Sequence, residues 1–85
     1  MRDTYGTRDA ARGVDATFRW LTEEVGELAR AIRVGGEEER RLEMSDVVAW
    51  VASLANLLDI DLDDAMRRYA EGCPKCHARP CVCAP

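Results

Sequence analysis

The apolar positions of this chain recur at helical spacing in three stretches. The first runs over residues 15–34 and ends at Gly35-Gly36, a typical helix stop. The second covers residues 37–58. The third follows Asp61, which has the character of an N-cap, and continues over residues 61–71. No stretch shows the alternation of a half-buried strand, so the pattern predicts an all-α fold.

The two ends of the chain are less regular. Residues 1–12 fit either the end of another helix or an extended arm. Residues 73–85 contain prolines and follow Gly72, which predicts an irregular tail. We therefore expect a helical domain over residues 1–72 and a Cys-rich tail over residues 73–85.

Each long helix has one narrow apolar stripe, which we expect to face the core. On the first helix the stripe consists of Phe18, Leu21, Val25, Leu28 and Ile32. On the second helix it consists of Val47, Val51, Leu54 and Leu58.

Acidic residues one turn apart lie beside the stripe of the first helix, and on and beside that of the second, where Glu43 interrupts the apolar side. On the first helix the strip holds Trp20, Glu24, Glu27 and Ala31, and on the second it holds Glu43, Asp46, Trp50 and Ser53. An acid pair on a helix is usually a solvated face, and a Trp beside it usually fills a core. Two such pairs on half-buried surfaces instead favour a shared cation, because close carboxylates repel and are costly to desolvate. Mg²⁺ prefers such oxygen ligands.

Composition narrows the class of protein. The chain has 85 residues, of which 47% are apolar and 33% charged, with a net charge of −4. This predicts one small soluble domain that needs a partner subunit or a metal, and it argues against non-specific nucleic-acid binding. No apolar run reaches the roughly 18–20 residues that span a membrane, and no signal peptide is visible. A cytoplasmic location is expected.

Two short motifs carry a resemblance to a known family. Residues 23–28, Glu-Glu-Val-Gly-Glu-Leu, match E-E-x-x-E, and residues 43–46, Glu-Met-Ser-Asp, match E-x-x-D. With their flanks, such as residues 17–21 and 53–56, they make the chain resemble the MazG-like nucleotide pyrophosphohydrolases over about residues 12–71.

The resemblance implies a helical hairpin of the four-helix-bundle type, completed in a homodimer or homotetramer. It implies hydrolysis of a (d)NTP by water to a (d)NMP and pyrophosphate, with Mg²⁺ or Mn²⁺ as cofactor. The implied metal ligands are Glu24, Glu27, Glu43 and Asp46. Glu23 would orient or deprotonate the attacking water, and Trp20, Trp50 and Ser53 would contact the substrate.

This sequence also departs from the family pattern. Many relatives have Asn in place of Ser53 and Gly in place of Ser45, and they have a longer helix before residue 12. The preferred base and sugar and the attacked phosphorus stay open. A catalytically inactive helical interaction module, or a metal-binding protein using the tail, is the alternative function. Arg67 and Arg68 are either phosphate contacts or solvated cations.

All four cysteines lie in the tail, at Cys73, Cys76, Cys81 and Cys83. Clustered thiols favour a local metal clip over a disulfide framework, and four thiolates can hold one Zn²⁺ as in a zinc knuckle. His77 is able to replace one thiolate. The competing interpretation is a flexible thiol-rich tail that is ordered by a partner or oxidised.

Overall fold

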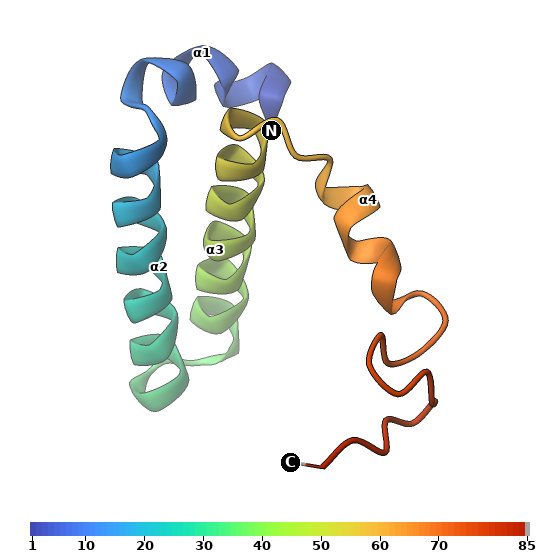
Figure 1. The fold of residues 1–85 in the computed structure, drawn as a ribbon. Helices are drawn as coiled ribbons and strands as arrows, with labels where there is room; N and C mark the ends of the chain where they lie inside the picture. The colour runs from blue at the N-terminus through green and yellow to red at the C-terminus, as the bar shows by residue number, and fades with distance from the viewer. Residues whose placement is uncertain (85) are drawn as a thin grey trace.

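The computed structural model describes residues 1–84 and contains four α-helices, with no strand among those residues. This confirms the all-α prediction. Helices α2 (Val14–Val34) and α3 (Glu37–Leu57) form an antiparallel hairpin that makes up most of the molecule (Figure 1). Both lie within one residue of the predicted bounds at each end, because their Gly and Asp flanks end and begin helices clearly.

The turn of the hairpin is closed by a glycine and an arginine. At Gly35 a Cβ atom would lie 2.9 Å from the carbonyl oxygen of Ala31, so this close approach favours glycine. The guanidinium of Arg40 on α3 donates hydrogen bonds to the carbonyl oxygens of Ala31 at 3.2 Å and Ile32 at 3.1 Å. The carbonyl of Ala31 also accepts from the backbone N–H of Gly35 at 2.9 Å. Arg40 therefore adds donors at the C-terminal end of α2 and ties it to the start of α3.

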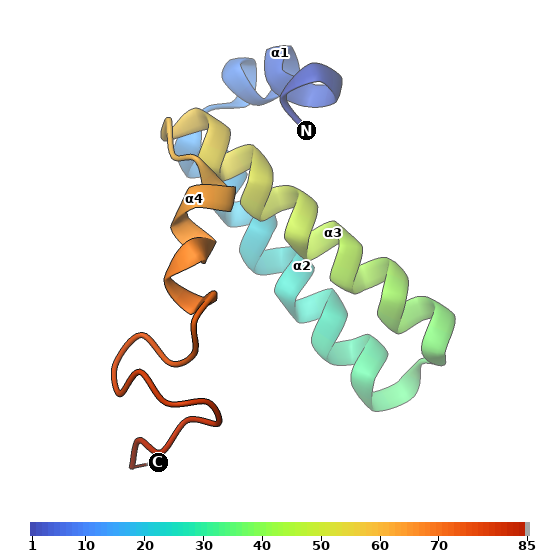
Figure 2. The same cartoon turned by 90° about the vertical axis from the view of Figure 1, so that its right-hand side faces the viewer.

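Residues left open by the sequence pattern form helix α1 (Arg2–Arg12), which lies across the open end of the hairpin (Figures 1 and 2). It contacts both α3 and α2. The chain turns sharply into α2 at Gly13, whose φ of 87° lies in the region that favours glycine. The helical alternative for residues 1–12 is therefore the one observed.

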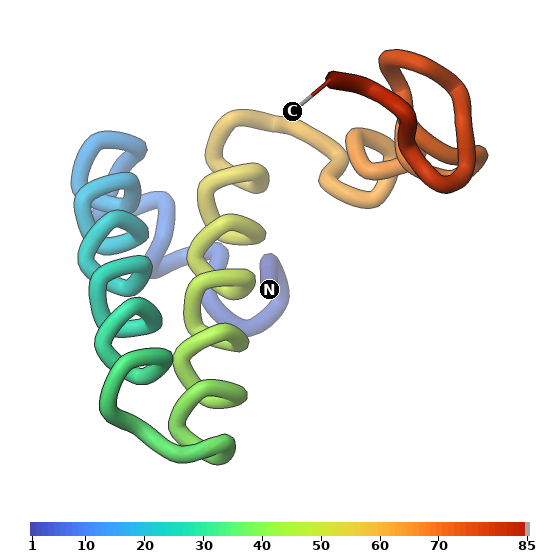
Figure 3. Tube along the Cα trace, turned by 90° about the horizontal axis from the view of Figure 1, so that it is seen from below, coloured from blue at the N-terminus to red at the C-terminus, as the bar shows by residue number. Residues whose placement is uncertain are grey.

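The third predicted helix is shorter than expected. Asp61 is its N-cap, as predicted, and its carboxylate accepts a hydrogen bond from the backbone N–H of Asp64 at 3.1 Å. However, α4 spans only Leu62–Met66, and the short 3₁₀ helix η1 (Arg67–Tyr69) follows it. Helix α4 and η1 contact mainly each other, and the tail leads away from the hairpin (Figures 1 and 3). With little to pack against, a longer third helix gains no tertiary support.

The predicted core stripe of α2 was wrong in part. Phe18, Val25 and Ile32 are 53%, 50% and 56% exposed. The fully buried apolar residues among residues 1–84 are Ala31 and Ala55, with Thr17, Ser53 and Asp9 as buried polar ones. Amphipathic spacing identifies an apolar face, but the face that packs on α3 is set by where the partner helix lies.

The molecule is more extended than a compact domain of its length. Its radius of gyration is 15.6 Å, whereas about 12 Å is expected for 85 residues. Apolar faces of the hairpin therefore stay uncovered within the single chain. No helix among residues 1–84 combines the length and apolar character needed to cross a membrane.

Candidate functional site

Three acids from the two long helices meet at the seam of the hairpin. Glu24 of α2 and Glu43 and Asp46 of α3 each place one carboxylate oxygen within 4.8 Å of the others, and all three are half-buried. We call this group the acid seam. The i, i+3 spacing puts Glu43 and Asp46 on one face of α3, and the antiparallel pairing brings Glu24 opposite them. The prediction that the acidic strips of the two helices face each other is thus confirmed in geometry for these three residues.

The acid seam perturbs its own electrostatics. The pKa of Glu24 is raised above its ordinary value, first by desolvation and then by the negative charges of Asp46, Glu43 and Glu27. A carboxylate surrounded in this way is stabilised by any cation that neutralises the group. Oxygen donors at this spacing suit a hard divalent ion such as Mg²⁺.

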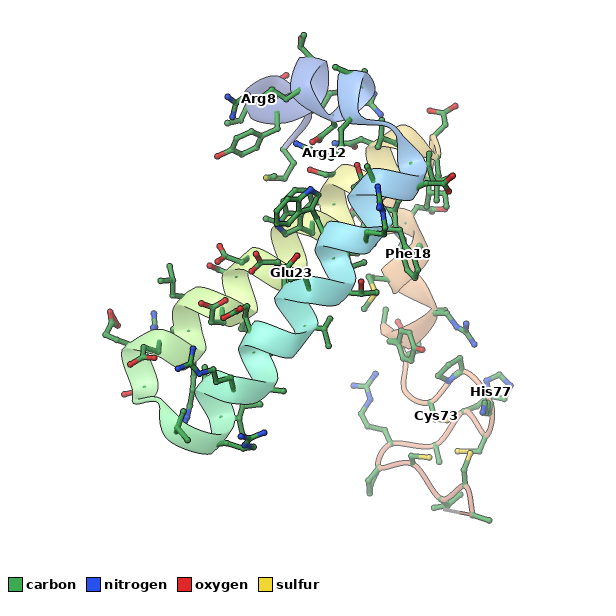
Figure 4. All side chains as sticks on the ribbon, turned by 90° about the vertical axis from the view of Figure 1, so that its left-hand side faces the viewer. Arg8, Arg12, Phe18, Glu23, Cys73 and His77 are labelled. Atoms are coloured by element: carbon green, nitrogen blue, oxygen red, sulfur yellow. The ribbon has the colours of Figure 1, made fainter. Side chains whose placement is uncertain are left out.

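The other two predicted acids lie outside the three-acid group. Glu27 is exposed one turn further along α2, and with Glu43 it lines a shallow hollow at the closed end of the hairpin. Its charge still contributes to the raised pKa of Glu24. Glu23 is exposed on α2 next to Glu24 in sequence (Figure 4). The two residues are therefore close along the helix to the acid seam without being part of it.

Two tryptophans and an arginine stack at the open end of the hairpin, beside α1. The rings of Trp20 and Trp50 are stacked, with their centroids 6.1 Å apart and their planes 15° from parallel. The guanidinium of Arg12 lies 4.7 Å from the centre of the Trp50 ring, in cation–π geometry. Sequence reasoning placed the tryptophans on facing strips but did not include Arg12.

A hollow of about 240 Å³ opens next to this stack, between α1 and α3. It is lined by Met1, Tyr5, Arg8, Asp9, Arg12, Asp46, Ala49, Trp50 and Ser53. Asp46 thus belongs to both the acid seam and this hollow. Ser53, predicted to contact substrate, is buried in its wall. Arg8 and Arg12 project from α1 at this end of the molecule (Figure 4).

Asp9 is the least expected residue of this wall. It is 2% exposed, and its Oδ1 pairs with the guanidinium of Arg12 at 2.8 Å. Within residues 1–84, its Oδ2 atom has no hydrogen-bond partner. A buried carboxylate oxygen is costly without a donor, so this atom makes Asp9 an energetically unfavourable part of the wall. The sequence signal that could have found it is an Asp–Arg pair three positions apart just before Gly13.

The two candidate phosphate contacts on the third helix lie on η1. Arg67 pairs with the exposed carboxylate of Asp63 at 3.7 Å, and Arg68 lies over the ring of Tyr69 at 5.3 Å. Neither arginine is among the residues that line the hollow beside α1. Their partners are local, as expected of solvated cations near a helix end.

The tail also gathers its predicted residues. The sulfurs of Cys73, Cys76, Cys81 and Cys83 all lie within 4.8 Å of one another, and none is in a disulfide. His77 does not belong to this group, although it lies on the same segment (Figure 4). Hydrogen bonds from the backbone N–H groups of Val82 and Ala78 lower the pKa of the Cys76 thiol to about 6.

Comparison with known proteins agrees with this geometry. A family model described as the MazG nucleotide pyrophosphohydrolase domain matches residues 12–80. The chain belongs to the MazG family. No curated protein gives a significant match. The MazG match includes the whole hairpin and so all the acids of both motifs, whereas it ends before Cys81 and Cys83. Members of this family of nucleotide pyrophosphohydrolases typically depend on Mg²⁺.

Proposed function

We propose that this MazG-family chain is a Mg²⁺-dependent nucleoside triphosphate pyrophosphohydrolase that converts a (d)NTP and water to a (d)NMP and pyrophosphate. One observation carries the proposal. Glu24 of α2 meets Glu43 and Asp46, which lie one turn apart on α3, with one carboxylate oxygen of each within 4.8 Å of the others. The family supplies the reaction class, and the acid seam supplies a place suited to a divalent ion.

Glu24, Glu43 and Asp46 would hold the ion, with Glu27 as a fourth ligand. The part of Glu27 is supported by its charge, which contributes to the raised pKa of Glu24. Mg²⁺ bound here would neutralise phosphate charge and lower the pKa of a bound water. Mn²⁺ would serve the same ligands. The acids themselves position the ion at the seam, and phosphoryl transfer depends mainly on such positioning.

Glu23 is proposed to orient or deprotonate the attacking water. Its support is its place in the E-E-x-x-E motif and its exposure on α2, where the carboxylate is free to reach a water beside the seam. A carboxylate within reach of the attacking water can act as a general base. A Glu23→Gln variant should therefore bind the metal normally and turn over slowly.

The nucleoside is proposed to occupy the hollow between α1 and α3. Asp46 lines this hollow as well as the acid seam, so phosphates at the metal and a base in the hollow can belong to one ligand. The Trp50 ring offers a stacking surface, and the Ser53 hydroxyl offers a hydrogen bond.

A nucleotide panel tests the activity directly. The protein is incubated with each (d)NTP and Mg²⁺, and pyrophosphate release is measured. Wild-type protein should release pyrophosphate from at least one nucleotide, and Glu43→Gln should abolish most of it. Glu38→Gln is the matched control, because Glu38 is a highly exposed acid of the same helix that pairs only loosely with Arg41 at 3.9 Å. If the wild type released no pyrophosphate from any nucleotide, the alternative of a catalytically inactive interaction module would be favoured.

Substitutions in the hollow separate substrate choice from chemistry. Ser53→Asn introduces the residue that many relatives have at this position. Asp9→Asn replaces one carboxylate oxygen, an acceptor, by an amide N–H₂ group, a donor. Each should change the ranking of nucleotides by kcat/KM more than it changes the dependence of the rate on Mg²⁺ concentration. An unchanged ranking in both variants would place the nucleoside elsewhere.

We also propose that the active form is a homodimer or homotetramer. Phe18, Val25 and Ile32 recur every seven residues along α2 and are about half exposed. Such a stripe is suited to pack against a second helical hairpin. Light scattering coupled to size exclusion should give a molar mass of two or four times the 9.5 kDa of one chain. Val25→Lys should shift the measured mass towards that of the monomer.

A further inference from the structure

The sulfur positions in the tail have the spacing of a single metal centre. The Sγ atoms of Cys73 and Cys83 are 3.7 Å apart, and those of Cys76 and Cys81 are 3.9 Å apart. With metal–sulfur bonds of about 2.3 Å, a tetrahedral site separates any two sulfurs by about 3.8 Å. We propose that Cys73, Cys76, Cys81 and Cys83 form a structural Zn²⁺ site, independent of the acid seam.

The backbone around the sulfurs is arranged as in a closed metal loop. The N–H of Lys75 points at the sulfur of Cys73 at 3.4 Å, and the N–H of Cys83 points at the sulfur of Cys81 at 3.3 Å. Such N–H···S bonds orient thiolates and stabilise their charge. They also show how the tight Cys81–Cys83 spacing is accommodated, because the intervening turn directs both sulfurs to the same side as the first pair.

The loop is closed at its base by backbone contacts. Cys73 donates its N–H to the carbonyl of Ala78 at 3.1 Å, and it accepts from the N–H of His77 at 2.7 Å. Gly72 has φ of 118°, and a Cβ there would lie 3.0 Å from the Ala78 carbonyl oxygen. The guanidinium of Arg79 donates to the carbonyl of Ala70 at 3.0 Å. These contacts hold the two cysteine pairs facing each other.

Apart from these hydrogen bonds, the tail over residues 73–84 has no packing that would hold it together. Every residue from 73 to 84 is exposed or half-buried, so no hydrophobic core lies within it. A short loop with no core gains its order from cross-links, and a bound metal supplies four at once. Thiolates are soft ligands that favour Zn²⁺ over Mg²⁺, whereas the carboxylates of the acid seam have the opposite preference.

Two further observations concern the charge of the tail and the residue at which the family match ends. Four thiolates with Zn²⁺ carry a net charge of −2, and the tail holds two cations, Lys75 and Arg79, that offset it. The MazG match ends at residue 80, so half of the ligand set lies beyond the region shared with the family. The proposed Zn²⁺ site thus takes two of its ligands, Cys73 and Cys76, from the matched region and two from beyond it.

Metal analysis of the full chain tests the proposal. Protein purified under reducing conditions should contain one Zn²⁺ per chain by elemental analysis. Titration of the metal-free chain with Co²⁺ alone should give the visible absorption of a tetrahedral tetrathiolate centre and saturate at one equivalent. Cys76→Ser and Cys81→Ser should each weaken Zn²⁺ binding at least tenfold.

Two control variants make the outcome specific. His77→Asn removes the imidazole while keeping a residue that tolerates the φ of 62° found there, and it should bind Zn²⁺ like the wild type. Glu43→Gln should also keep the Zn²⁺, because it changes only the acid seam. A metal-free wild type with two disulfides, iron in place of zinc, or Zn²⁺ retained by both cysteine variants would overturn the proposal.

Discussion

The acid seam and the cysteine tail bring metal-ligating side chains together in opposite ways. Glu24 reaches Glu43 and Asp46 only because two long helices pack as a hairpin, so the scaffold is built before any ion binds. The four sulfurs come from one segment without a hydrophobic core, residues 73–83, whose order would depend on the proposed Zn²⁺ cross-link. A rigid scaffold leaves ligand positions free for substrate, whereas a loop needs all of its ligands to stay folded. The difference fits the two proposals, a catalytic centre in the hairpin and a structural one in the tail.

The largest expected difference between the two regions follows from removing a proposed Mg²⁺ ligand of the hairpin. Asp46→Asn should lower kcat/KM for the best nucleotide at least about a hundredfold, because losing a metal ligand removes several kcal/mol of charge stabilisation. Steady-state pyrophosphate release measures this, and the Zn²⁺ content should stay at one equivalent. Asp63→Asn, an exposed acid paired with Arg67 at 3.7 Å, is the control and should leave the rate unchanged. Equal losses in both variants would contradict a specific role for Asp46.

The second prediction concerns the helix that covers the open end of the hairpin. Arg12→Gln should reduce the free energy of unfolding by about 2 kcal/mol, because it leaves the buried Asp9 carboxylate without its cation. Urea denaturation followed by circular dichroism measures this. Arg41→Gln breaks an exposed pair with Glu38 and should cost less than about 0.5 kcal/mol. If the two variants were equally stable, α1 would not be held by Asp9 and Arg12, and the hollow would lose one wall.

The third prediction concerns how the affinity of the tail for Zn²⁺ depends on the backbone conformation at Gly72. Gly72→Ala should weaken Zn²⁺ binding about tenfold, because a side chain at φ of 118° and a 3.0 Å contact with Ala78 cost roughly 1–2 kcal/mol. Competition with a chromophoric chelator measures the affinity. Gly36→Ala, where a Cβ meets no atom within 4 Å, is the control and should bind Zn²⁺ normally. Turnover of nucleotide should be the same in both.

The smallest expected effect is on pH dependence. The folded-state pKa of Glu24 is raised above 4.5, so the metal-free folded chain binds this proton more tightly than the unfolded chain. Its stability should therefore fall as pH rises from about 4.5 to the raised pKa, and Mg²⁺ should remove that fall. Thermal melts with and without Mg²⁺ check this. Glu24→Gln should flatten the pH profile without metal, and a melt that rises over this window would contradict the assignment.

The parts of the molecule that were predictable are those with a local signal. The two motifs fixed Glu24, Glu43 and Asp46 on facing helix strips, and the cysteine spacing indicated one cluster. The exposure of Phe18 and Val25 was not predictable, because amphipathicity does not say which neighbour covers a face.

For a related reason, the sequence left residues 1–12 open between a helix and an extended arm. The sequence of α1 is largely polar, and Arg12 holds this helix to the hairpin through contacts with Thr17 and Trp50. These two tertiary contacts do not follow from helix spacing, whereas the Asp9–Arg12 pair within α1 does. The hollow beside the acid seam, and with it the proposed choice of nucleoside, depends on those contacts.

The stack of Trp20, Trp50 and Arg12 gives this protein a built-in optical reporter. The chain has two tryptophans, and both lie in that stack, so its indole fluorescence originates at one place. The cation over Trp50 and the nearby Asp46 make the emission sensitive to local charge. A nucleotide entering the hollow, or α1 lifting from the hairpin, should change the emission intensity without any added label. Stopped-flow fluorescence can then time binding separately from hydrolysis.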